Sequence, residues 1–347
     1  MRFFTLKRQL LFSMFVVFGC LAIHAVDDEL ITKQITVKLD EAGTLPNKIG
    51  STKKYQITNL KIVGEINGRD LQLIRDMAGC DDRGSSTKGK LAILDLVEAR
   101  IVSGEYYYYE SCNTHDDIIG NYAFYGCHSL TSLSLPEDIT SIGSFAFYGC
   151  HSLTSLSLPE DITSIGSFAF YGCRSLTSLS LPEGITSIWN YTFYDCCRLA
   201  NFSLPNSIAS IGDCAFYGCR GLTSLSFPRG ITSIAQAAFY DCSGLTSIYV
   251  YAEKLPKMGS HVFDGCEAEK CTLYVPKGTY DDYWLSEFGY FENIEEFDVT
   301  GIDKVSTSSD VKEVSRYSVN GQRLAAPTKG LNIVKYSDGS VKKVVVQ

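Results

Sequence analysis

The sequence predicts a β-rich repeat solenoid with an N-terminal α/β cap and a small C-terminal β module. The first observation behind this prediction is a repeat, since the 23 residues from 127 to 149 recur without change at 150 to 172. The second is the period, which diverged copies keep at 23 residues. One cysteine marks each copy, at Cys127, Cys150, Cys173, Cys196, Cys219 and Cys242, and a degenerate copy ends near Cys266, one residue out of phase. A unit of this size cannot bury its apolar face alone, so the copies must stack and share one core.

Each repeat predicts one coil of such a stack. Leu133 and Leu135 alternate with small hydroxyl residues, as a half-buried strand requires. Pro136 ends the strand, because proline has no N–H to donate to a continuing ladder. Ile139 and Ile142 then bring the chain back with apolar groups directed inward.

Stacked coils predict columns of like residues in the core. An aromatic group in the turn of each coil forms one column, and a leucine before each strand forms another. The predicted aromatic column is Phe124, Phe147, Phe170, Phe193, Phe216, Phe239 and Phe263. The predicted leucine column is Leu130, Leu153, Leu176, Leu199, Leu222 and Leu245.

The repeat pattern IGxxAFxxCxxLxxLxLPxxITx resembles the BspA-type (Treponema-type) leucine-rich repeat over residues 118–278. Residues 271–280, CTLYVPKGTY, are similar to the unit that closes such arrays, and we assign residues 279–300 to the closing segment. The resemblance implies a curved solenoid with a strand-lined face. It also implies a surface protein, since better-known members adhere to host matrix proteins and to other bacteria.

The N-terminus predicts an export signal in residues 1–25. A basic start precedes an apolar run from Leu10 to Ile23, which is too short for a comfortable membrane span and is followed by acidic residues. Cleavage after Ala25 is the first interpretation, and lipidation at Cys20, within the lipobox-like VFGC, is the alternative. No second apolar run follows, so we expect membrane association only through export or anchoring. The expected location is the medium or the outer-membrane surface of a Gram-negative bacterium.

Residues 26–117 predict the N-terminal cap, which a solenoid needs because an open end exposes core. The segment 67–70, NGRD, can start a helix whose Leu71, Ile74 and Ala78 share one face. The whole segment resembles the N-terminal caps of Bacteroides-type repeat proteins.

Two further stretches of the cap carry predictions. Residues 91–96, LAILDL, predict a first, irregular repeat strand. The aromatic run from Tyr106 to Tyr109 has two interpretations, a loop packed on the first coil or an exposed binding patch.

Residues 301–347 predict the C-terminal β module. Asn320-Gly321 and Asp338-Gly339 each lie between two strand-like stretches and supply the positive φ angles that tight hairpin turns need. The segments SVNGQRL and KGLNIVKYSDGSVKKVVVQ resemble C-terminal sorting domains of the type IX secretion system, which implies transport through the outer membrane and often surface attachment. Such domains often end in a basic residue where this chain has Gln347, and an uncleaved β cap is the alternative.

The charge of the chain argues against a nucleic-acid partner. The formal charge is −8, and the first 25 residues hold three basic residues and no acid, so the remainder carries −11. Phosphate repels such a body, and no basic run offsets the repulsion.

The cysteines predict neither a metal site nor a cofactor. Metal ligands must converge on one point, and the chain has no CxxC pair or Cys/His cluster that would do so. Side chains in a column point parallel to one another, so the repeat cysteines are expected to be small buried groups rather than disulfides. Export would permit oxidation elsewhere, and pairing of Cys266 with Cys271 or of Cys80 with Cys112 stays open.

We expect no catalytic residue. His128 and His151 are the same repeat position, and Arg174 replaces them in the next copy. The pairs Glu137-Asp138 and Glu160-Asp161 lie beside each other after the strand proline, whereas a hydrolase needs two carboxylates that face each other. They are predicted to be solvated turn residues, and no nucleophile elbow or phosphate loop occurs.

Two surfaces are candidates for ligand contact. The first is a tyrosine stripe, for which the alternative is that each ring packs on the next and only shields the core. Its residues are Tyr125, Tyr148, Tyr171, Tyr194, Tyr217 and Tyr240. The second is the hydroxyl-rich strand face, represented by Thr131, Ser132, Ser134, Thr154, Ser155, Ser157, Thr177, Ser178 and Ser180.

These observations predict an exported, adhesin-like surface protein that recognises a host matrix or bacterial surface protein through its solenoid. Capture of a glycan without catalysis is one alternative, and a structural component of the cell envelope is another.

Overall fold

The computed structural model describes residues 29–299, 313–318, 323–324, 330–336 and 341–346. The chain divides into two units, one up to Glu296 and one from Phe297 to Gln347, close to the predicted boundary after residue 300. The predicted export signal lies outside the described residues.

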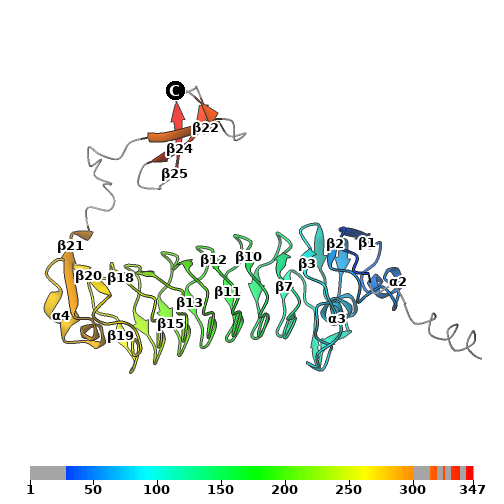
Figure 1. Cartoon of the computed structure of the whole chain (residues 1–347), viewed down its shortest axis with the longest axis horizontal. Coiled ribbons are helices and arrows are strands. Elements are labelled where there is room, and N and C mark those ends of the chain that lie inside the picture. Colours follow the sequence, from blue (N-terminus) through cyan, green and yellow to red (C-terminus); the bar gives the residue numbers. More distant parts are fainter. Residues whose placement is uncertain (1–28, 300–312, 319–322, 325–329, 337–340, 347) are drawn as a thin grey trace, which may run out of the picture. The chain divides into compact units, whose positions relative to one another are not determined.

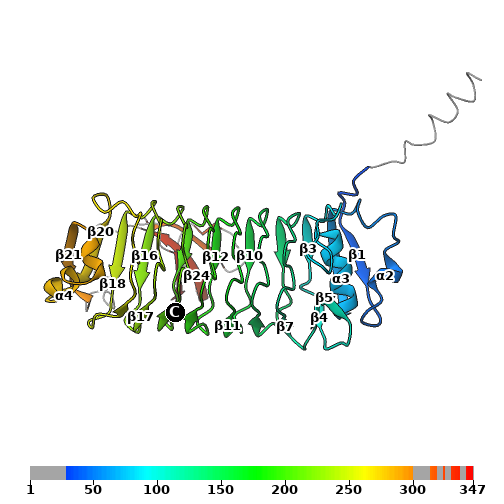
Figure 2. The same cartoon turned by 90° about the horizontal axis from the view of Figure 1, so that it is seen from below.

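The first unit contains a β-solenoid in which each 23-residue repeat makes one coil, as the sequence predicts (Figures 1 and 2). Parallel strands from successive coils pair in register, so that Ser155 lies opposite Ser132 and Leu156 opposite Leu133. The strands of this face are β3 (Ile93–Asp95), β8 (Ser132–Ser134), β10 (Ser155–Ser157), β12 (Ser178–Ser180), β14 (Asn201–Ser203), β16 (Ser224–Phe227), β18 (Ser247–Val250) and β20 (Thr272–Pro276).

A second row of two-residue strands forms where each coil turns back. They belong to two sheets, ordered β11-β9-β7 and β13-β15-β17-β19. These strands are β7 (Ile118–Ile119), β9 (Ser141–Ile142), β11 (Ser164–Ile165), β13 (Ser187–Ile188), β15 (Ser210–Ile211), β17 (Ser233–Ile234) and β19 (Lys257–Met258).

The predicted core columns are confirmed. All seven phenylalanines and all six leucines of the two columns are buried, and neighbouring phenylalanine rings stack with centroids 5.1 to 5.9 Å apart. Ile139 and Ile142 are buried as well, which completes the apolar lining of the coil.

Two hydrogen-bond ladders join the coils and run in opposite senses. In the turn, the Phe147 N–H donates to the carbonyl of Ala169 in the next coil, with N···O 2.7 Å. Ahead of the strand, the Thr154 N–H donates to the carbonyl of Thr131 in the preceding coil, with N···O 3.0 Å. The same two bonds recur along the array, so each coil is tied to both of its neighbours.

The column cysteines are buried thiols, and the structure adds a role that the sequence does not reveal. The Cys173 Sγ donates to the carbonyl of Phe147 in the preceding coil at 3.2 Å, and equivalent bonds recur from Cys150 to Cys266. Burial raises the pKa of Cys127 to about 12. The twelve cysteines among the described residues are free thiols, so the candidate pairs of Cys266 with Cys271 and of Cys80 with Cys112 are not disulfides here.

One position of the turn holds a non-glycine residue in left-handed backbone conformation in every coil. The φ values are +51 to +60° at Tyr122, Phe145, Phe168, Tyr191, Cys214, Ala237 and His261. An L-residue pays a steric cost there, because its Cβ crowds the following carbonyl oxygen. The first members of this column stack on one another, but Ala237 has no ring that could offset the cost.

We therefore predict that Ala237→Gly stabilises the protein. Relief of the left-handed strain, about 1–2 kcal/mol, exceeds the added chain entropy of glycine, about 0.5–1 kcal/mol, so the free energy of unfolding should rise by about 0.5–1 kcal/mol. Denaturant titration followed by circular dichroism measures this change. Ala238→Gly is the matched control, since Ala238 is buried and has no positive φ, and it should destabilise. A loss of stability in Ala237→Gly would contradict the argument.

The N-terminal cap contains the predicted helix. Helix α3 begins after Asn67, whose side chain accepts a hydrogen bond from a first-turn N–H while Asp70 bonds back to the Asn67 N–H. Leu71, Ile74 and Ala78 are buried, which confirms the predicted face. The cap elements are β1 (Ile35–Lys38), α2 (Leu45–Lys48), β2 (Asn59–Ile66), α3 (Gly68–Met77), β4 (Ala99–Ile101), β5 (Tyr107–Tyr109) and β6 (Cys112–Asn113).

The cap joins the array in two ways. Strand β3 pairs with β8 and continues the parallel sheet, so residues 91–96 hold the first repeat strand as predicted. The buried Arg75 of α3 reaches the first complete coil, where its Nη1 donates to the carbonyls of Tyr122 and Ala123. In later coils the alanine carbonyl accepts the phenylalanine N–H of the coil before it, as Ala146 does from Phe124. Arg75 thus supplies the donor that a missing preceding coil would provide.

The C-terminal end of the solenoid is closed by aromatic residues. Tyr283, Phe288 and Phe291 are buried, and the rings of Phe288 and Phe291 lie 5.3 and 5.0 Å from that of Phe263, the last member of the aromatic column. The closing elements are α4 (Tyr280–Trp284), the short 3-10 helix η1 (Glu287–Tyr290) and β21 (Asn293–Phe297), the last of which pairs with β20.

The second unit contains an antiparallel sheet of order β23-β22-β24-β25. The strands predicted to flank each turn do pair with each other, β22 with β23 and β24 with β25, whereas the two turn dipeptides lie outside the described residues. The strands are β22 (Glu313–Ser318), β23 (Arg323–Leu324), β24 (Gly330–Tyr336) and β25 (Val341–Val346). Over the described part of the chain, no helix has the length and apolar character needed to cross a membrane.

Candidate binding surface

The strand face presents its serines to solvent and its leucines to the core. In β10, Ser155 and Ser157 are exposed on either side of the buried Leu156. This alternation follows from the two-residue period of a strand. In β8 and β12 too, the central leucine is buried and the serines on either side are at least partly accessible. The serine half of the predicted hydroxyl surface is therefore accessible.

The threonine hydroxyls of the same predicted surface donate hydrogen bonds to backbone carbonyls. Thr131 Oγ1 donates to the Ala92 carbonyl at 3.0 Å, and Thr154 Oγ1 donates to the Thr131 carbonyl at 2.9 Å. Thr177 repeats this bond to the Thr154 carbonyl at 3.3 Å. Their hydroxyl protons join the coils and are less available to a ligand.

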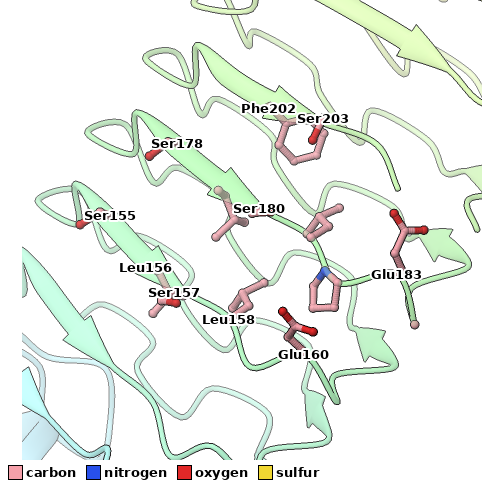
Figure 3. Close-up of a pocket in the computed structure, with 14 residues that line it drawn as sticks. Ser155, Leu156, Ser157, Leu158, Glu160, Ser178, Ser180, Glu183, Phe202 and Ser203 are labelled. Carbon is pink, nitrogen blue, oxygen red and sulfur yellow. The ribbon is translucent and has the colours of Figure 1, made fainter. Parts of the chain in front are cut away.

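A groove of about 950 Å³ runs across β10, β12 and β14 (Figure 3). Serine hydroxyls line the part over the strands, and Leu158, Leu181 and Pro182 give it an apolar side. Glu160 and Glu183 lie where the strands end. The predicted contacts that line it are Ser155, Ser157, Ser178 and Ser180.

A second, smaller hollow of about 510 Å³ shares Ser157, Leu158 and Glu160 with the groove and extends toward the cap. Ser134 and Glu137 also line it. The accessible surface is thus continuous over the coils of β8, β10 and β12.

The acidic rim of this groove was missed when the acids were interpreted as solvated turn residues. Glu137, Asp138, Glu160, Asp161 and Glu183 are indeed exposed. The structure also sets the glutamates in one row along the groove, and Glu183 accepts a hydrogen bond from the Asn206 N–H at 3.0 Å. Their common place in the repeat was the signal that could have identified this row.

The tyrosine stripe forms a continuous stack. Successive rings from Tyr125 to Tyr240 have centroids 4.6 to 5.0 Å apart and planes within 13° of parallel. Each ring is half-buried, and the rings of Tyr148, Tyr171, Tyr194 and Tyr217 have a stacked neighbour on both faces. In these four inner rings the stacking leaves only the edges open to solvent, an arrangement that favours packing over a role as a platform for a sugar ring.

A second aromatic stack was not anticipated from the sequence. Tyr122, Phe145, Phe168 and Tyr191, the left-handed turn residues, stack with centroids 4.6 to 4.8 Å apart. Both stacks begin against Tyr109 of the cap, whose ring lies 4.9 Å from that of Tyr122 and 5.4 Å from that of Tyr125.

The aromatic run of the cap divides into a packed pair and an exposed pair. Tyr106 and Tyr107 are 58 % and 57 % exposed, whereas Tyr108 and Tyr109 are buried. The guanidinium of Arg69 lies 5.7 Å from the Tyr106 ring centroid. The inner pair packs on the first coil, and the outer pair is open to solvent.

The histidines of the repeat bond to turn backbone. His128 Nδ1 lies 3.1 Å from the Gly126 carbonyl oxygen, and His151 Nδ1 lies 2.8 Å from that of Gly172. Within the described ranges, no three His, Cys, Asp or Glu side chains are grouped so that they could hold a metal ion.

Comparison with known proteins gives one family. The model of the BspA type leucine-rich repeat region matches residues 117–222 and 209–324, more than half of the chain. No curated protein matches.

Three solved structures illustrate the similarity. A leucine-rich repeat protein of T. pallidum is 34% identical over 44% of this chain and 71% of its own, with a TM-score of 0.40. A leucine-rich repeat protein of Bacteroides ovatus is 23% identical over 76% of this chain and 70% of its own, with a TM-score of 0.41. A leucine-rich cell surface protein of Faecalibacterium prausnitzii is 19% identical over 71% and 80%, with a TM-score of 0.31.

Proposed function

This chain belongs to the BspA-type leucine-rich-repeat family, and from that premise we propose that it is an adhesin-like protein, which binds a protein of a host or of another bacterium through its strand face. The observation that carries the proposal is the groove of about 950 Å³ across β10, β12 and β14. It combines exposed hydroxyls, an apolar side and two carboxylates, the mixture of contacts that gives a protein surface both area and specificity.

Binding without catalysis fits this surface. The groove glutamates follow one another along a single edge, so they do not oppose each other across a substrate as hydrolytic carboxylates do. No cofactor enters the proposal.

Glycan capture is the second candidate, because sugar hydroxyls could bond to Ser157, Ser180 and Glu160 in the groove. The stacked tyrosines lend this candidate little support, since their faces are covered. A purely structural role in the envelope is the third.

The expected measurement is binding of the chain from residue 26 onward to immobilised extracellular-matrix proteins, in parallel with a glycan array. Ser180→Tyr should weaken binding to a captured matrix protein by about tenfold or more, because the ring occupies the groove. Ser226→Tyr is the matched control, since Ser226 is exposed on the same face but does not line the groove, and it should retain affinity. Matrix binding that Ser180→Tyr leaves unchanged would contradict the groove, and binding to the glycan array alone would favour the second candidate.

Export completes the proposal. The apolar run from Leu10 to Ile23 supports a signal peptide, and the C-terminal β module supports passage to the outer membrane by the type IX route. The N-terminus of protein recovered from the cell surface or the medium should be residue 26, or a lipidated Cys20 under the alternative. An N-terminus at Met1 on cytoplasmic protein would refute export.

A further inference from the structure

We propose that the ligand segment held by this groove is an extended peptide carrying Lys or Arg at alternate positions. The inference deepens the proposed function and rests on it. It commits to a partner whose charge complements the groove.

The first step is the row of glutamates. The register of β3 with β8 sets Asp95 opposite Ser134, so Glu98 occupies the same repeat position as Glu137. The row therefore runs Glu98, Glu137, Glu160 and Glu183 over four successive coils.

The second step is that three of these four glutamates have no ion-pair partner among the described residues. Glu98 pairs with Lys61 at 2.7 Å, and this pair closes the row at the cap. Across the described part of the chain, no Lys, Arg or His lies within ion-pair distance of Glu137, Glu160 or Glu183. The next two coils carry Asn206 and Arg229 at this position, so the acidic stretch covers only the coils that line the groove and the adjoining hollow.

The third step is spacing. Neighbouring strands lie about 4.8 Å apart, so three carboxylates span roughly 10 Å along the row. Side chains on one face of an extended peptide recur about every 6.7 Å. Two basic residues at alternate positions can therefore reach the row together, since each long side chain tolerates an offset of a few ångströms.

The fourth step is the rest of the groove. The exposed hydroxyls of Ser157 and Ser180 can bond to the peptide backbone. Leu158 lies near Glu160, and Pro182 immediately precedes Glu183 in the sequence. Both line the groove, where they can cover the aliphatic stem of a lysine. The groove thus offers separate partners for the head, the stem and the backbone of such a segment.

The test uses a fluorescent octapeptide of alternating Lys and Ser and the chain from residue 26 onward, with affinity measured by fluorescence anisotropy. We expect Glu160→Gln/Glu183→Gln to weaken binding about tenfold, and added salt to weaken wild-type binding. The matched control is Glu253→Gln/Glu292→Gln, which removes the same charge at two exposed glutamates away from the groove and should change the affinity less than about twofold. A peptide of alternating Glu and Ser should not bind.

Two results would overturn the inference. Equal losses in the two double variants would mean that the net negative charge alone attracts the peptide, and no binding by the wild type would mean that the groove does not select basic segments. The two proposals also separate in the matrix-protein assay. If Ser180→Tyr abolishes binding there while Glu160→Gln/Glu183→Gln retains it, the proposed function stands and the basic ligand is wrong.

Discussion

Arg75→Met should lower the free energy of unfolding by about 3–5 kcal/mol, because it removes the charged donor that joins the cap to the first coil. The arginine is fully buried, its two terminal nitrogens donate to the carbonyls of Tyr122, Ala123 and Asp81, and its guanidinium lies 4.7 Å from the Tyr109 ring centroid. Methionine keeps most of the volume but removes the donor to the buried Ala123 carbonyl. The carbonyls of Tyr122 and Asp81 each lose one donor and keep at least one other.

Denaturant titration measures the total loss, and hydrogen exchange of the α3 amides locates it in the cap. Arg69→Met is the control, since Arg69 is exposed on the same helix, and it should cost under about 1 kcal/mol. A loss of similar size in both variants would show that Arg75 has no special role at the interface.

Phe170→Ala is the second large effect, with an expected loss of about 3–5 kcal/mol. The ring is fully buried near the middle of the array and stacks on Phe147 at 5.1 Å and on Phe193 at 5.4 Å. Its removal leaves a cavity, and the neighbouring coils cannot collapse into it because the ladders fix their spacing.

Phe168→Ala makes the same chemical change two residues away, where the ring is half-buried in the second aromatic stack. It should cost less than half as much, as judged by denaturant titration of both variants side by side. Equal losses in the two variants would show that the aromatic column contributes no more to stability than the second aromatic stack.

The period of the sequence was enough to predict the architecture and its core. Once Phe147 and Phe170 occupy one repeat position, stacking places them over each other whatever the details of the coil. The same logic predicted the buried cysteines. In the cap, which lies outside the repeat, helical spacing instead predicted the buried face formed by Leu71, Ile74 and Ala78.

The candidate surface was less predictable, because residues with the same functional group make different contacts. Thr154 and Ser155 are neighbours with the same functional group, yet only the threonine hydroxyl lies within reach of a carbonyl of the preceding coil. The partners of Arg75 in the first coil, Tyr122 and Ala123, are 47 and 48 residues away in sequence, so no local pattern could indicate them. The left-handed backbone at Phe145 and Phe168 opposes the local preference of aromatic residues and is set by the turn.

The two opposed ladders also have an electrostatic consequence for growth of the array. In an α-helix all peptide dipoles point the same way, so partial charges develop at its two ends. Here the turn N–H groups point toward the following coil and the threonine N–H groups point toward the preceding one, as at Phe147 and Thr154. Their dipoles largely cancel along the axis, and a further coil adds little field at either end. The duplication of residues 127–149 could therefore lengthen the solenoid by a whole coil without an electrostatic penalty at the caps.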